Sequence, residues 1–484
     1  MIILSEAIIG NKLIERNDKL NIYNPSTGDI IDTIPLLGQN DIKEAIDIAS
    51  EAFNHYSITP IIDRKKLLLK TANLIYNNKE ELAKLMALET GRPINSSRAE
   101  IERTGAIFES CAWEIHNVVK GEFIQFNSFE YPKGNENRIG ITVREPLGVI
   151  ASITPFNFPG ASFAHKVGPA LAMGNTVVHK PTQYAPLLQI ALGKLLLKAG
   201  FPPGTINIVT GNSSMIGKEF TSNPLIKLIT FTGSSKVGLS LASEGIKHGI
   251  KSIMELGGSD AQIILDDADI SYAVEKATFG RYDYSGQFCN STKRLIVSNK
   301  IIDKVISYIK NRLSQLKVGN ALNESTDIGP LISNDSINNM KLFLDDALKN
   351  GSQILYQGKT PTETGYFFPP TLVMVNNNKS KILNEEVFGP ILPIISTQND
   401  EETIQIVNSS KYGLDAAIFS KNFDRAYKMA RQLNVGTVLI NDTTRLRWDN
   451  VAFGGTKFSG IGRESIKDTM LEMSEQKVIE YTVR

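Results

Sequence analysis

Residues 254–294 contain two side chains whose chemistry suits covalent catalysis. Glu255 stands just before a Leu-Gly-Gly turn, and Cys289 follows the residues Ser-Gly-Gln-Phe. A free thiol with its usual pKa of about 8.5 is only a few per cent thiolate at neutral pH, so a nucleophilic cysteine needs a base or a lowered pKa. We therefore interpret Cys289 as a candidate nucleophile and Glu255 as a candidate base on a different loop.

An amide donor is the third candidate. Asn157 lies in the sequence Pro-Phe-Asn-Phe-Pro, directly after a strand predicted over 148–153. An amide paired with a backbone N–H stabilises an oxyanion, usually by a factor of about 100–1000. Taken alone, an asparagine between prolines is more often a turn residue, so its role depends on the rest of the chain.

The overall composition excludes several function classes. A length of 484 residues favours two or three domains, and 42% hydrophobic with 21% charged residues is typical of a globular protein. The net charge of +1 gives no reason to expect a nucleic-acid partner. No run approaches the ~20 apolar residues of a membrane span. The opening MIILSEAIIGNKLIERN lacks the basic start and cleavage site of a signal peptide.

The cysteines and histidines favour a reducing compartment and no metal site. Two cysteines, Cys111 and Cys289, are too few for a disulfide scaffold, no CxxC or Cys/His cluster occurs, and the five histidines are scattered. We expect a cytoplasmic protein in which each cysteine is either a small core residue or a reactive thiol.

The elements that must position these side chains fall into two series of alternating strands and helices. The first has strands at 148–153, 175–179, 206–209 and 226–231, with helices at 164–173, 187–199, 214–221 and from the turn after 231 to about 249. The second has strands at 261–265, 294–297, 391–396, 416–419 and 437–440, with helices at 270–282, 302–316, 400–409 and 423–433. Such alternation predicts βαβ units and parallel sheets, hence an α/β fold.

Other segments flank these series. We predict a hairpin at 20–36, helices at 41–54, 64–88 and 97–121, a strand-like excursion at 123–144, and a strand-like tail at 473–483.

Two glycine-containing loops are candidate phosphate sites. FTGSSKVG (231–238) joins a predicted strand to a helix, whose amides and dipole could face a pyrophosphate, although no GxGxxG occurs in the chain. GNSSMIGKEF (211–220) resembles a P-loop, but its spacing is one residue too long and Glu219 replaces the Mg-binding hydroxyl.

Lys180, at the end of a strand, could bind ribose or phosphate or could simply be solvated.

Seven segments in one order resemble the aldehyde dehydrogenase superfamily over essentially the whole chain. They are TPFNFP (154–159), GNTVVHKP (174–181), FTGSSKVG (231–238), MELGG (254–258), GQFCNSTKR (286–294), EEVFGP (385–390) and FGGTKFSGIGRE (453–464). The resemblance implies an aldehyde dehydrogenase-like α/β fold in three parts. These are a Rossmann-like cofactor-binding domain at 1–118 and 147–254, a catalytic α/β domain at 255–447, and a small β oligomerisation element at 119–146 and 470–484 that would form a dimer or tetramer.

The same resemblance implies a role for each candidate residue. Cys289 would attack an aldehyde to give a thiohemiacetal, Asn157 and the Cys289 N–H would hold the oxyanion, hydride would pass to a nicotinamide, and Glu255 would activate the water that hydrolyses the thioester. Lys180 and Glu386 would hold ribose hydroxyls. The family's cofactor fold departs from the usual fingerprint, which accounts for the missing GxGxxG. The implied cofactor contacts are Thr154, Pro155, Phe156, Lys180, Thr182, Gln183, Gly233, Ser234, Gly238, Leu256, Glu386 and Phe388.

The expected cofactor is NADP, with NAD possible. Members of the family that prefer NAD often carry a glutamate three residues after the lysine, where it bonds the adenosine 2′-hydroxyl. Gln183 stands at that place here. A neutral amide removes the repulsion of a 2′-phosphate, and Lys180 adds attraction.

The expected substrate is a small hydroxyaldehyde. Segments 282–287 and 441–449 look most like the branch of non-phosphorylating glyceraldehyde-3-phosphate, glyceraldehyde and lactaldehyde dehydrogenases. The implied substrate contacts are Arg103, Phe158, Phe288 and Arg447; Arg445 could also bind an anion, whereas Arg447 could simply pair with Asp449. Members that use the phosphate often have arginine in place of Phe288, so the phenyl ring favours an uncharged aldehyde such as glyceraldehyde.

Three alternatives remain open from the sequence. Succinate semialdehyde is a second substrate candidate, because an arginine could hold its far carboxylate. A CoA-acylating enzyme is disfavoured, because that branch generally lacks the base at Glu255. A catalytically silent structural or binding protein is disfavoured by the intact set of Cys289, Glu255 and Asn157.

Overall fold

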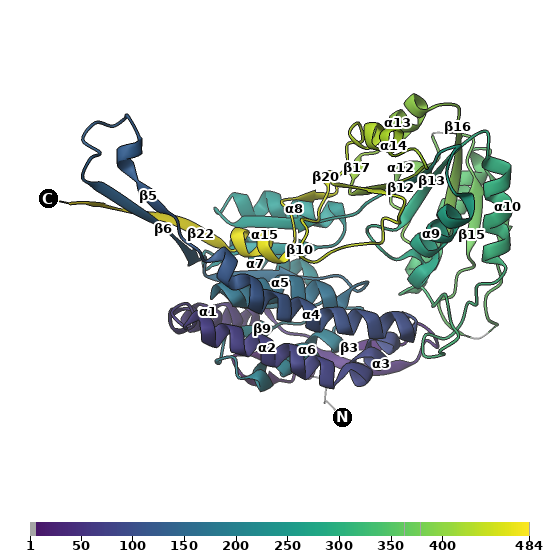
Figure 1. Ribbon diagram of the computed structural model, residues 1–484. Coiled ribbons are helices and arrows are strands. Elements are labelled where there is room, and N and C mark those ends of the chain that lie inside the picture. The colour runs from purple at the N-terminus through teal and green to yellow at the C-terminus, as the bar shows by residue number, and fades with distance from the viewer. Residues whose placement is uncertain (1–5, 363, 378, 484) are drawn as a thin grey trace.

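The computed structural model describes residues 6–362, 364–377 and 379–483. The first five residues of the opening segment and Arg484 of the predicted oligomerisation element lie outside this part. The chain forms two large sheets with helices packed on them, and a narrow arm of strands that projects from the body and ends at the C-terminus (Figure 1).

A hairpin and four helices lie in the chain between the two N-terminal strands and the parallel strands of the first sheet. The hairpin predicted at 20–36 is confirmed as β3 (Lys19–Tyr23) and β4 (Ile30–Pro35). The single helix predicted over 64–88 is wrong, because the chain breaks at Asn78, whose side-chain amide donates to Leu74 O at 2.7 Å and competes with the helix backbone. The helices are α1 (Gln39–Tyr56), α2 (Ile61–Asn77), α3 (Lys79–Thr90) and α4 (Ile94–Val118).

The first large sheet has the strand order β2-β1-β9-β8-β7-β10-β11-β21, and its five central strands are parallel. The chain runs from β7 outward to β8 and β9 and then returns to the other side of β7, so the loops after β7 and β10 diverge at a topological switch point, where open α/β sheets bind ligands. The strands are β1 (Ala7–Ile9), β2 (Lys12–Ile14), β7 (Val149–Ile153), β8 (Thr176–Lys180), β9 (Ile206–Ile208), β10 (Ile226–Thr232), β11 (Lys251–Glu255) and β21 (Gly460–Ile461).

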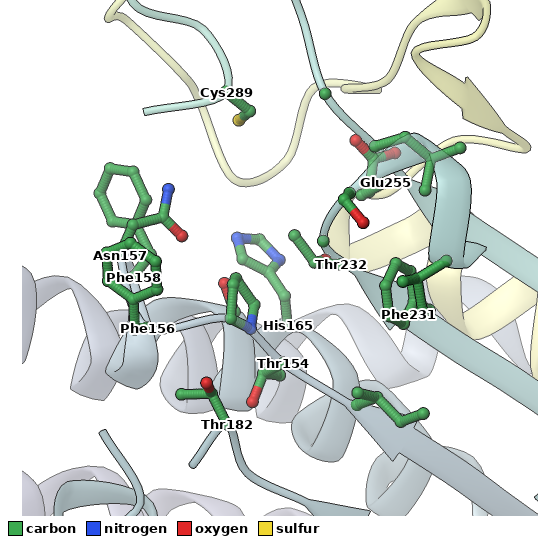
Figure 2. Close-up of a pocket in the computed structure, with 18 of the residues that line it drawn as sticks. Thr154, Phe156, Asn157, Phe158, His165, Thr182, Phe231, Thr232, Glu255 and Cys289 are labelled. Carbon is green, nitrogen blue, oxygen red and sulfur yellow. The ribbon is translucent and has the colours of Figure 1, made fainter. Parts of the chain in front are cut away.

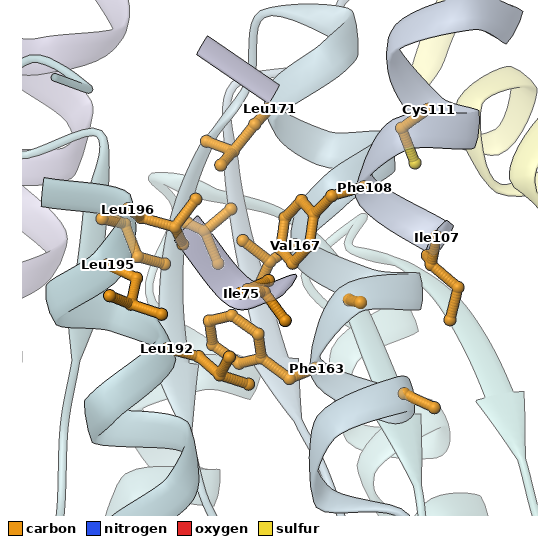
Figure 3. Packing of buried hydrophobic residues seen from close by; sticks show 14 of the residues in the cluster. Ile75, Ile107, Phe108, Cys111, Phe163, Val167, Leu171, Leu192, Leu195 and Leu196 are labelled. Atoms are coloured by element: carbon orange, nitrogen blue, oxygen red, sulfur yellow. The ribbon is translucent and has the colours of Figure 1, made fainter. Parts of the chain in front are cut away.

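Helices α5 (Pro159–Met173), α6 (Leu187–Ala199), α7 (Ser213–Ser222) and α8 (Ser235–Ile246) follow β7, β8, β9 and β10 in turn. Helix α5 starts five residues earlier than predicted, with Pro159 at its first position, where a missing N–H costs nothing. Apolar side chains of α2, α4, α5 and α6 pack into one core, in which Phe163 and Cys111 are fully buried (Figure 3).

The second large sheet has the order β14-β15-β16-β13-β12-β18-β19 and is parallel except for β14. Its strands are β12 (Asp260–Ile264), β13 (Thr292–Ser298), β14 (Gln353–Gln357), β15 (Thr371–Met374), β16 (Ile391–Thr397), β18 (Asp415–Phe419) and β19 (Thr437–Ile440). The helical elements on this side are α9 (Ile270–Tyr282), η2 (Asp283–Gly286), α10 (Ile302–Leu313), α11 (Asn334–Lys349), α12 (Lys381–Asn384), α13 (Asp400–Asn408) and α14 (Phe423–Ala430).

The last part of the chain returns to the first sheet. Short strands β17 (Tyr412–Gly413) and β20 (Thr456–Lys457) pair with each other, β21 pairs with β11, and α15 (Ile466–Glu472) lies on α4 and α5.

The arm confirms the strand-like character predicted for 123–144 and for the tail. It consists of β5 (Phe123–Gln125), the short helix η1 (Phe126–Ser128), β6 (Arg138–Pro146) and β22 (Ser474–Thr482). Strands β6 and β22 pair antiparallel along nine residues each, and β5 extends this sheet on the other side of β6. Apolar side chains such as Phe123, Val478 and Tyr481 are more than half exposed on the arm.

Candidate active site

A cavity of about 720 Å³ lies where the carboxyl ends of the first sheet meet the amino ends of the second. Because parallel strands end at a common edge, residues far apart in the chain converge there. Seventeen predicted residues line it, and Figure 2 shows several of them around one space. They are Arg103, Thr154, Pro155, Phe156, Asn157, Phe158, Lys180, Thr182, Gln183, Gly233, Ser234, Glu255, Leu256, Cys289, Glu386, Phe388 and Arg447.

The Cys289 thiol points into the space between Asn157 and Glu255 (Figure 2). The loop before it is strained, because Tyr284 and Ser285 have φ values of 45° and 56°, a conformation unusual for residues with a Cβ. Contacts outside the loop hold this shape: the Tyr284 hydroxyl donates to Thr90 O at 2.8 Å, and the Gln287 side chain accepts from Ile332 N at 3.0 Å.

Burial raises the pKa of the Cys289 thiol to about 12, against the opposing effect of the nearby Lys293 ammonium. The carboxylates of Asp260, Glu255 and Glu386 act in the same direction as burial. The thiol of the free protein is therefore held neutral, and a nucleophilic thiolate has to be formed through a base or a change in the surrounding charges.

Glu255 is the last residue of β11, and its side chain is 3% exposed. Burial raises the pKa of Glu255 well above its usual range, and the negative charge of Glu464 adds to this effect. Its Oε1 atom has no hydrogen-bond partner among the described residues. An unpartnered carboxyl group with a raised pKa that lines the cavity is suited to accept a proton from a bound molecule.

Asn157 lies between β7 and α5, and a buried ion pair fixes its backbone. Arg92 donates to Asn157 O at 3.2 Å and pairs with Glu100. Glu100 Oε1 in turn accepts from Gly160 N at 3.1 Å and Ala161 N at 3.3 Å, in the first turn of α5. A carboxylate at a helix N-terminus satisfies amides that otherwise lack partners, and here it also fixes the loop that carries Asn157.

The opposite end of the cavity fits a dinucleotide. Lys180 ends β8, donates to Pro181 O at 3.1 Å, and has its pKa lowered to about 8 by burial. The N-terminus of α8 opens onto the cavity through Gly233 and Ser234, and its first turn holds no acidic residue. Such an N-terminus favours an anionic group such as a pyrophosphate.

Two aromatic rings, those of Phe156 and Phe388, form part of the cavity wall. Phe156 packs edge-on against Phe388, with ring centroids 6.0 Å apart, and Glu386 reaches the same wall. These are the residues expected to hold the ribose and the nicotinamide.

Two predicted contacts do not line the cavity. Gly238 lies inside α8, where a Cβ would come within 2.3 Å of the Leu256 side chain, so this glycine serves helix–strand packing. Phe288 was expected to face the substrate, and this is wrong: its side chain is fully buried. The Arg445 guanidinium lies 3.5 Å from the centre of the Phe288 ring and covers it.

Each arginine that lines the cavity already has a carboxylate partner. Arg103 Nη2 is 2.6 Å from Asp449, and Arg445 Nη2 is 2.9 Å from Asp283. The expected alternative pairing of Arg447 with Asp449 is wrong, because Arg447 pairs with Glu464 at 2.9 Å. The three guanidinium groups are thus compensated by this chain's own carboxylates.

Several residues of the site were missed in the sequence. Lys166 and Glu464 form a buried ion pair of 2.7 Å. Burial alone would raise the pKa of Glu464, but the positive charges of Lys166 and Arg447 hold this pKa below its usual range. His165 Nε2 lies 2.8 Å from Asp449, and burial lowers the pKa of this histidine to about 4. A signal for Lys166 existed: it is a lone charge in the apolar run that forms α5, and a buried lysine needs a partner.

In the part of the chain that the structure describes, no group of three or more His, Cys, Asp or Glu side chains could hold a metal ion. No described helix is long and apolar enough to cross a membrane.

Comparisons with known proteins agree with this geometry. The aldehyde dehydrogenase family model matches residues 13–479, so the chain belongs to the aldehyde dehydrogenase family. It is therefore an NAD(P)-dependent oxidoreductase with the aldehyde dehydrogenase fold, as the sequence predicted.

Individual relatives cover nearly the whole chain. Lactaldehyde dehydrogenase of Methanocaldococcus jannaschii is 39% identical over 476 residues, which are 97% of this chain and 99% of that protein. The mitochondrial succinate-semialdehyde dehydrogenase of Oryza sativa subsp. japonica is 35% identical over 477 residues, 98% of this chain and 89% of that protein. The crystal structure of NADP-dependent glyceraldehyde-3-phosphate dehydrogenase from Bacillus halodurans, complexed with NADP, superimposes with a TM-score of 0.95 at 35% identity and covers 99% of both chains.

The neutral thiol leads to a prediction for the free protein. Alkylation of Cys289 by iodoacetamide should be slow at pH 7 and should rise about tenfold per pH unit up to at least pH 10, because the thiolate fraction grows with pH below the pKa. Mass spectrometry of the labelled peptide measures the rate. Cys289→Ser should take up no label, because Cys111 is fully buried. A rate that levels off below pH 9 would show that the thiol is already activated in the free protein.

Proposed function

We propose that this protein oxidises a small hydroxyaldehyde to its carboxylic acid through a covalent intermediate on Cys289. The observation that carries the proposal is the convergence of the Cys289 thiol, the Asn157 amide and the Glu255 carboxyl on one cavity (Figure 2). Lys180, Gly233 and Ser234 line the same cavity and would receive the dinucleotide. The family membership supports the reaction class.

The residues of this chain have separate tasks in the proposed reaction. The Cys289 thiolate adds to the aldehyde carbon, and the carbonyl oxygen becomes an alkoxide that accepts hydrogen bonds from the Asn157 amide and the Cys289 N–H. A bound nicotinamide supplies the acceptor for the hydride that leaves this carbon. Glu255 then takes a proton from water, the hydroxide attacks the thioester, and the Cys289 sulfur departs as the acid is released.

The proposed cofactor is NADP. Lys180 and Gln183 line the part of the cavity that would receive the adenosine ribose, together with Ser213 of the first turn of α7. No carboxylate among the described lining residues stands at this end, so nothing there repels a 2′-phosphate. The NADP complex of the Bacillus halodurans relative supports this choice.

The compensated arginines favour an uncharged substrate. A phosphate or a far carboxylate would have to displace Asp449, Asp283 or Glu464 from its guanidinium partner, at the cost of a partly buried ion pair. A hydroxyl group imposes no such cost. The resemblance to lactaldehyde dehydrogenase supports a hydroxyaldehyde such as lactaldehyde or glyceraldehyde. Succinate semialdehyde remains the second candidate because of the Oryza sativa relative.

We further propose the division into parts that the sequence predicted, namely a cofactor-binding domain, a catalytic domain and an oligomerisation element. Exposed apolar side chains on the arm, including Phe123 and Tyr481, favour a homo-oligomer, because large exposed apolar groups mark interfaces. Sedimentation velocity on the full chain would return a monomer if this is wrong.

Two free cysteines agree with a reducing cytoplasm, which fractionation of the producing cell would test.

Replacing the base separates the two halves of the reaction. Glu255→Gln should retain a burst of about one reduced cofactor per site and lose steady-state turnover by a factor on the order of 10²–10⁴, because hydrolysis then lacks its base. Stopped-flow absorbance measures the burst, and intact mass shows whether Cys289 stays acylated. Cys289→Ser should show no burst. Formation of an acyl-CoA by the wild type when CoA is added would instead assign the protein to the CoA-acylating type.

The cofactor preference depends on a single charge. Gln183→Glu should lower kcat/KM for NADP at least tenfold and raise it for NAD, because a carboxylate repels the 2′-phosphate and accepts from a 2′-hydroxyl. Steady-state kinetics with both cofactors measures the switch, and Gln432→Glu on the exposed surface is the matched control. A wild type that already prefers NAD would contradict the NADP assignment.

The substrate class is tested by comparing glyceraldehyde, lactaldehyde, glyceraldehyde 3-phosphate and succinate semialdehyde with NADP. We expect kcat/KM to be at least about tenfold higher for the two uncharged compounds, which corresponds to roughly 1.4 kcal/mol of discrimination. Equal or better activity on the phosphorylated compound, or on succinate semialdehyde, would show that an arginine leaves its carboxylate partner to bind the substrate.

A further inference from the structure

Lys293 is a buried cation that contacts the backbone of the nucleophile directly. It is the second residue of β13, and its side chain is fully buried. Its ammonium donates to Cys289 O at 2.6 Å and to Glu386 Oε1 at 2.7 Å. The Lys293 ammonium therefore connects Cys289, which would react with the aldehyde, to Glu386, which would hold the cofactor ribose.

The turn after Glu255 closes the same cluster. Gly258 N donates to the same Glu386 oxygen at 3.1 Å. A Cβ on Gly257 would come within 2.3 Å of Glu386 Oε2, and a Cβ on Gly258 within 2.6 Å of Cys289 O. The two glycines thus let the base loop approach both partners of Lys293, so that three loops from different parts of the chain meet at one ammonium.

The Lys293 ammonium is a positive charge in a region of carboxyl groups that act on the pKa of the Cys289 thiol. Carboxyl groups face this region from several elements: Glu255 from β11, Asp260 from β12, Asp415 from β18, and Glu386 from the loop before β16. Lys293 opposes the effect of burial on the pKa of Cys289, whereas Asp260, Glu255 and Glu386 reinforce it. Without the ammonium, the negative charge of Glu386 would act on the thiol uncompensated.

A purely structural role would not require this arrangement. A buried ion pair usually contributes little net stability over apolar side chains of the same shape, because both charges lose their hydration. Lys293 nevertheless divides its hydrogen bonds between a carboxylate at the cofactor end and the carbonyl of the nucleophile.

We propose that Lys293 is a positioning residue that couples occupation of the cofactor site to the reactivity of the Cys289 thiol. When Glu386 accepts hydrogen bonds from ribose hydroxyls, these hydroxyls offset part of the negative charge of the Glu386 carboxylate. The positive charge of Lys293 is then less compensated by Glu386 and acts more strongly on Cys289. The thiol then becomes more acidic once the cofactor is bound. This inference rests on the proposed roles of Cys289 and Glu386.

The experiment measures thiol reactivity in the full-length protein without turnover. Lys293→Met should slow iodoacetamide labelling of Cys289 at pH 8.5 at least tenfold, whereas Lys293→Arg should retain most of the rate. Glu386→Gln should act in the opposite direction and accelerate labelling, and the double variant should fall between the two single variants. Lys300→Met is the control, because Lys300 is an exposed lysine paired with Asp266.

A second readout follows cofactor binding by NADPH fluorescence. In the wild type, bound NADPH should accelerate labelling severalfold, and in Lys293→Met this acceleration should disappear while the Kd for NADPH rises. Equal labelling rates in wild type and Lys293→Met, with unchanged acceleration by NADPH, would overturn the coupling. If Lys293→Met does not fold, as judged by circular dichroism, Glu386→Gln decides the matter: NADPH should no longer accelerate labelling in this variant, because the carboxylate that the ribose would engage is gone, and an acceleration equal to that of the wild type would overturn the coupling.

Failure of this inference can be told apart from failure of the proposed function. Cys289→Ser is assayed in parallel with glyceraldehyde and NADP. If that variant still reduces the cofactor, the proposed mechanism is wrong. If it is inactive while the Lys293 variants label and bind like the wild type, only the coupling is wrong.

Discussion

The cost of keeping charged groups out of water governs this structure. Where the two sheets meet, Glu255, Lys166, Glu464 and Lys293 are all 3% exposed or less. A charge in such a place is tolerated only with a partner, and Lys166–Glu464 and Lys293–Glu386 are such pairs. Among the described residues, Glu255 has no such ion-pair partner: burial and the charge of Glu464 raise its pKa, although Arg447 and Lys166 act in the opposite direction. A carboxyl group in this position is suited to exchange a proton with a molecule in the cavity.

Contacts from other elements hold the loops around the thiol in shape. The proposed hydride transfer and later hydrolysis at one carbon require that thiol, amide and carboxyl keep fixed positions. The left-handed backbone at Tyr284 and Ser285 persists because hydrogen bonds from other segments hold it. Arg92 does the same for Asn157 through the first turn of α5. Contacts between elements, rather than the loops themselves, therefore fix these backbone conformations.

The sequence predicted the family, the α/β fold and most element positions, because hydrophobic periodicity and the order of seven short motifs are local signals. The β11 strand was missed, so Glu255 was assigned to the start of the second series although it ends a strand of the first sheet. Helix α11 was also missed, although Met340, Leu344 and Ala347 have the spacing of a buried helix face in an otherwise polar segment. The burial of Phe288 could not be predicted, since it depends on Arg445 and Phe158, which come from distant parts of the chain.

The correction at Phe288 changes the reason for expecting an uncharged substrate. From the sequence, the reason was that a phenyl ring facing the substrate cannot bind phosphate. In the structure, the Phe288 ring packs against the Arg445 guanidinium, and the Asp283 carboxylate forms an ion pair with the same guanidinium. An arginine at position 288 would place a second cation against Arg445, so phenylalanine there is tied to the local charge balance. The selectivity against anions that we propose then depends on the pairing of each described cavity arginine with a carboxylate of the chain itself.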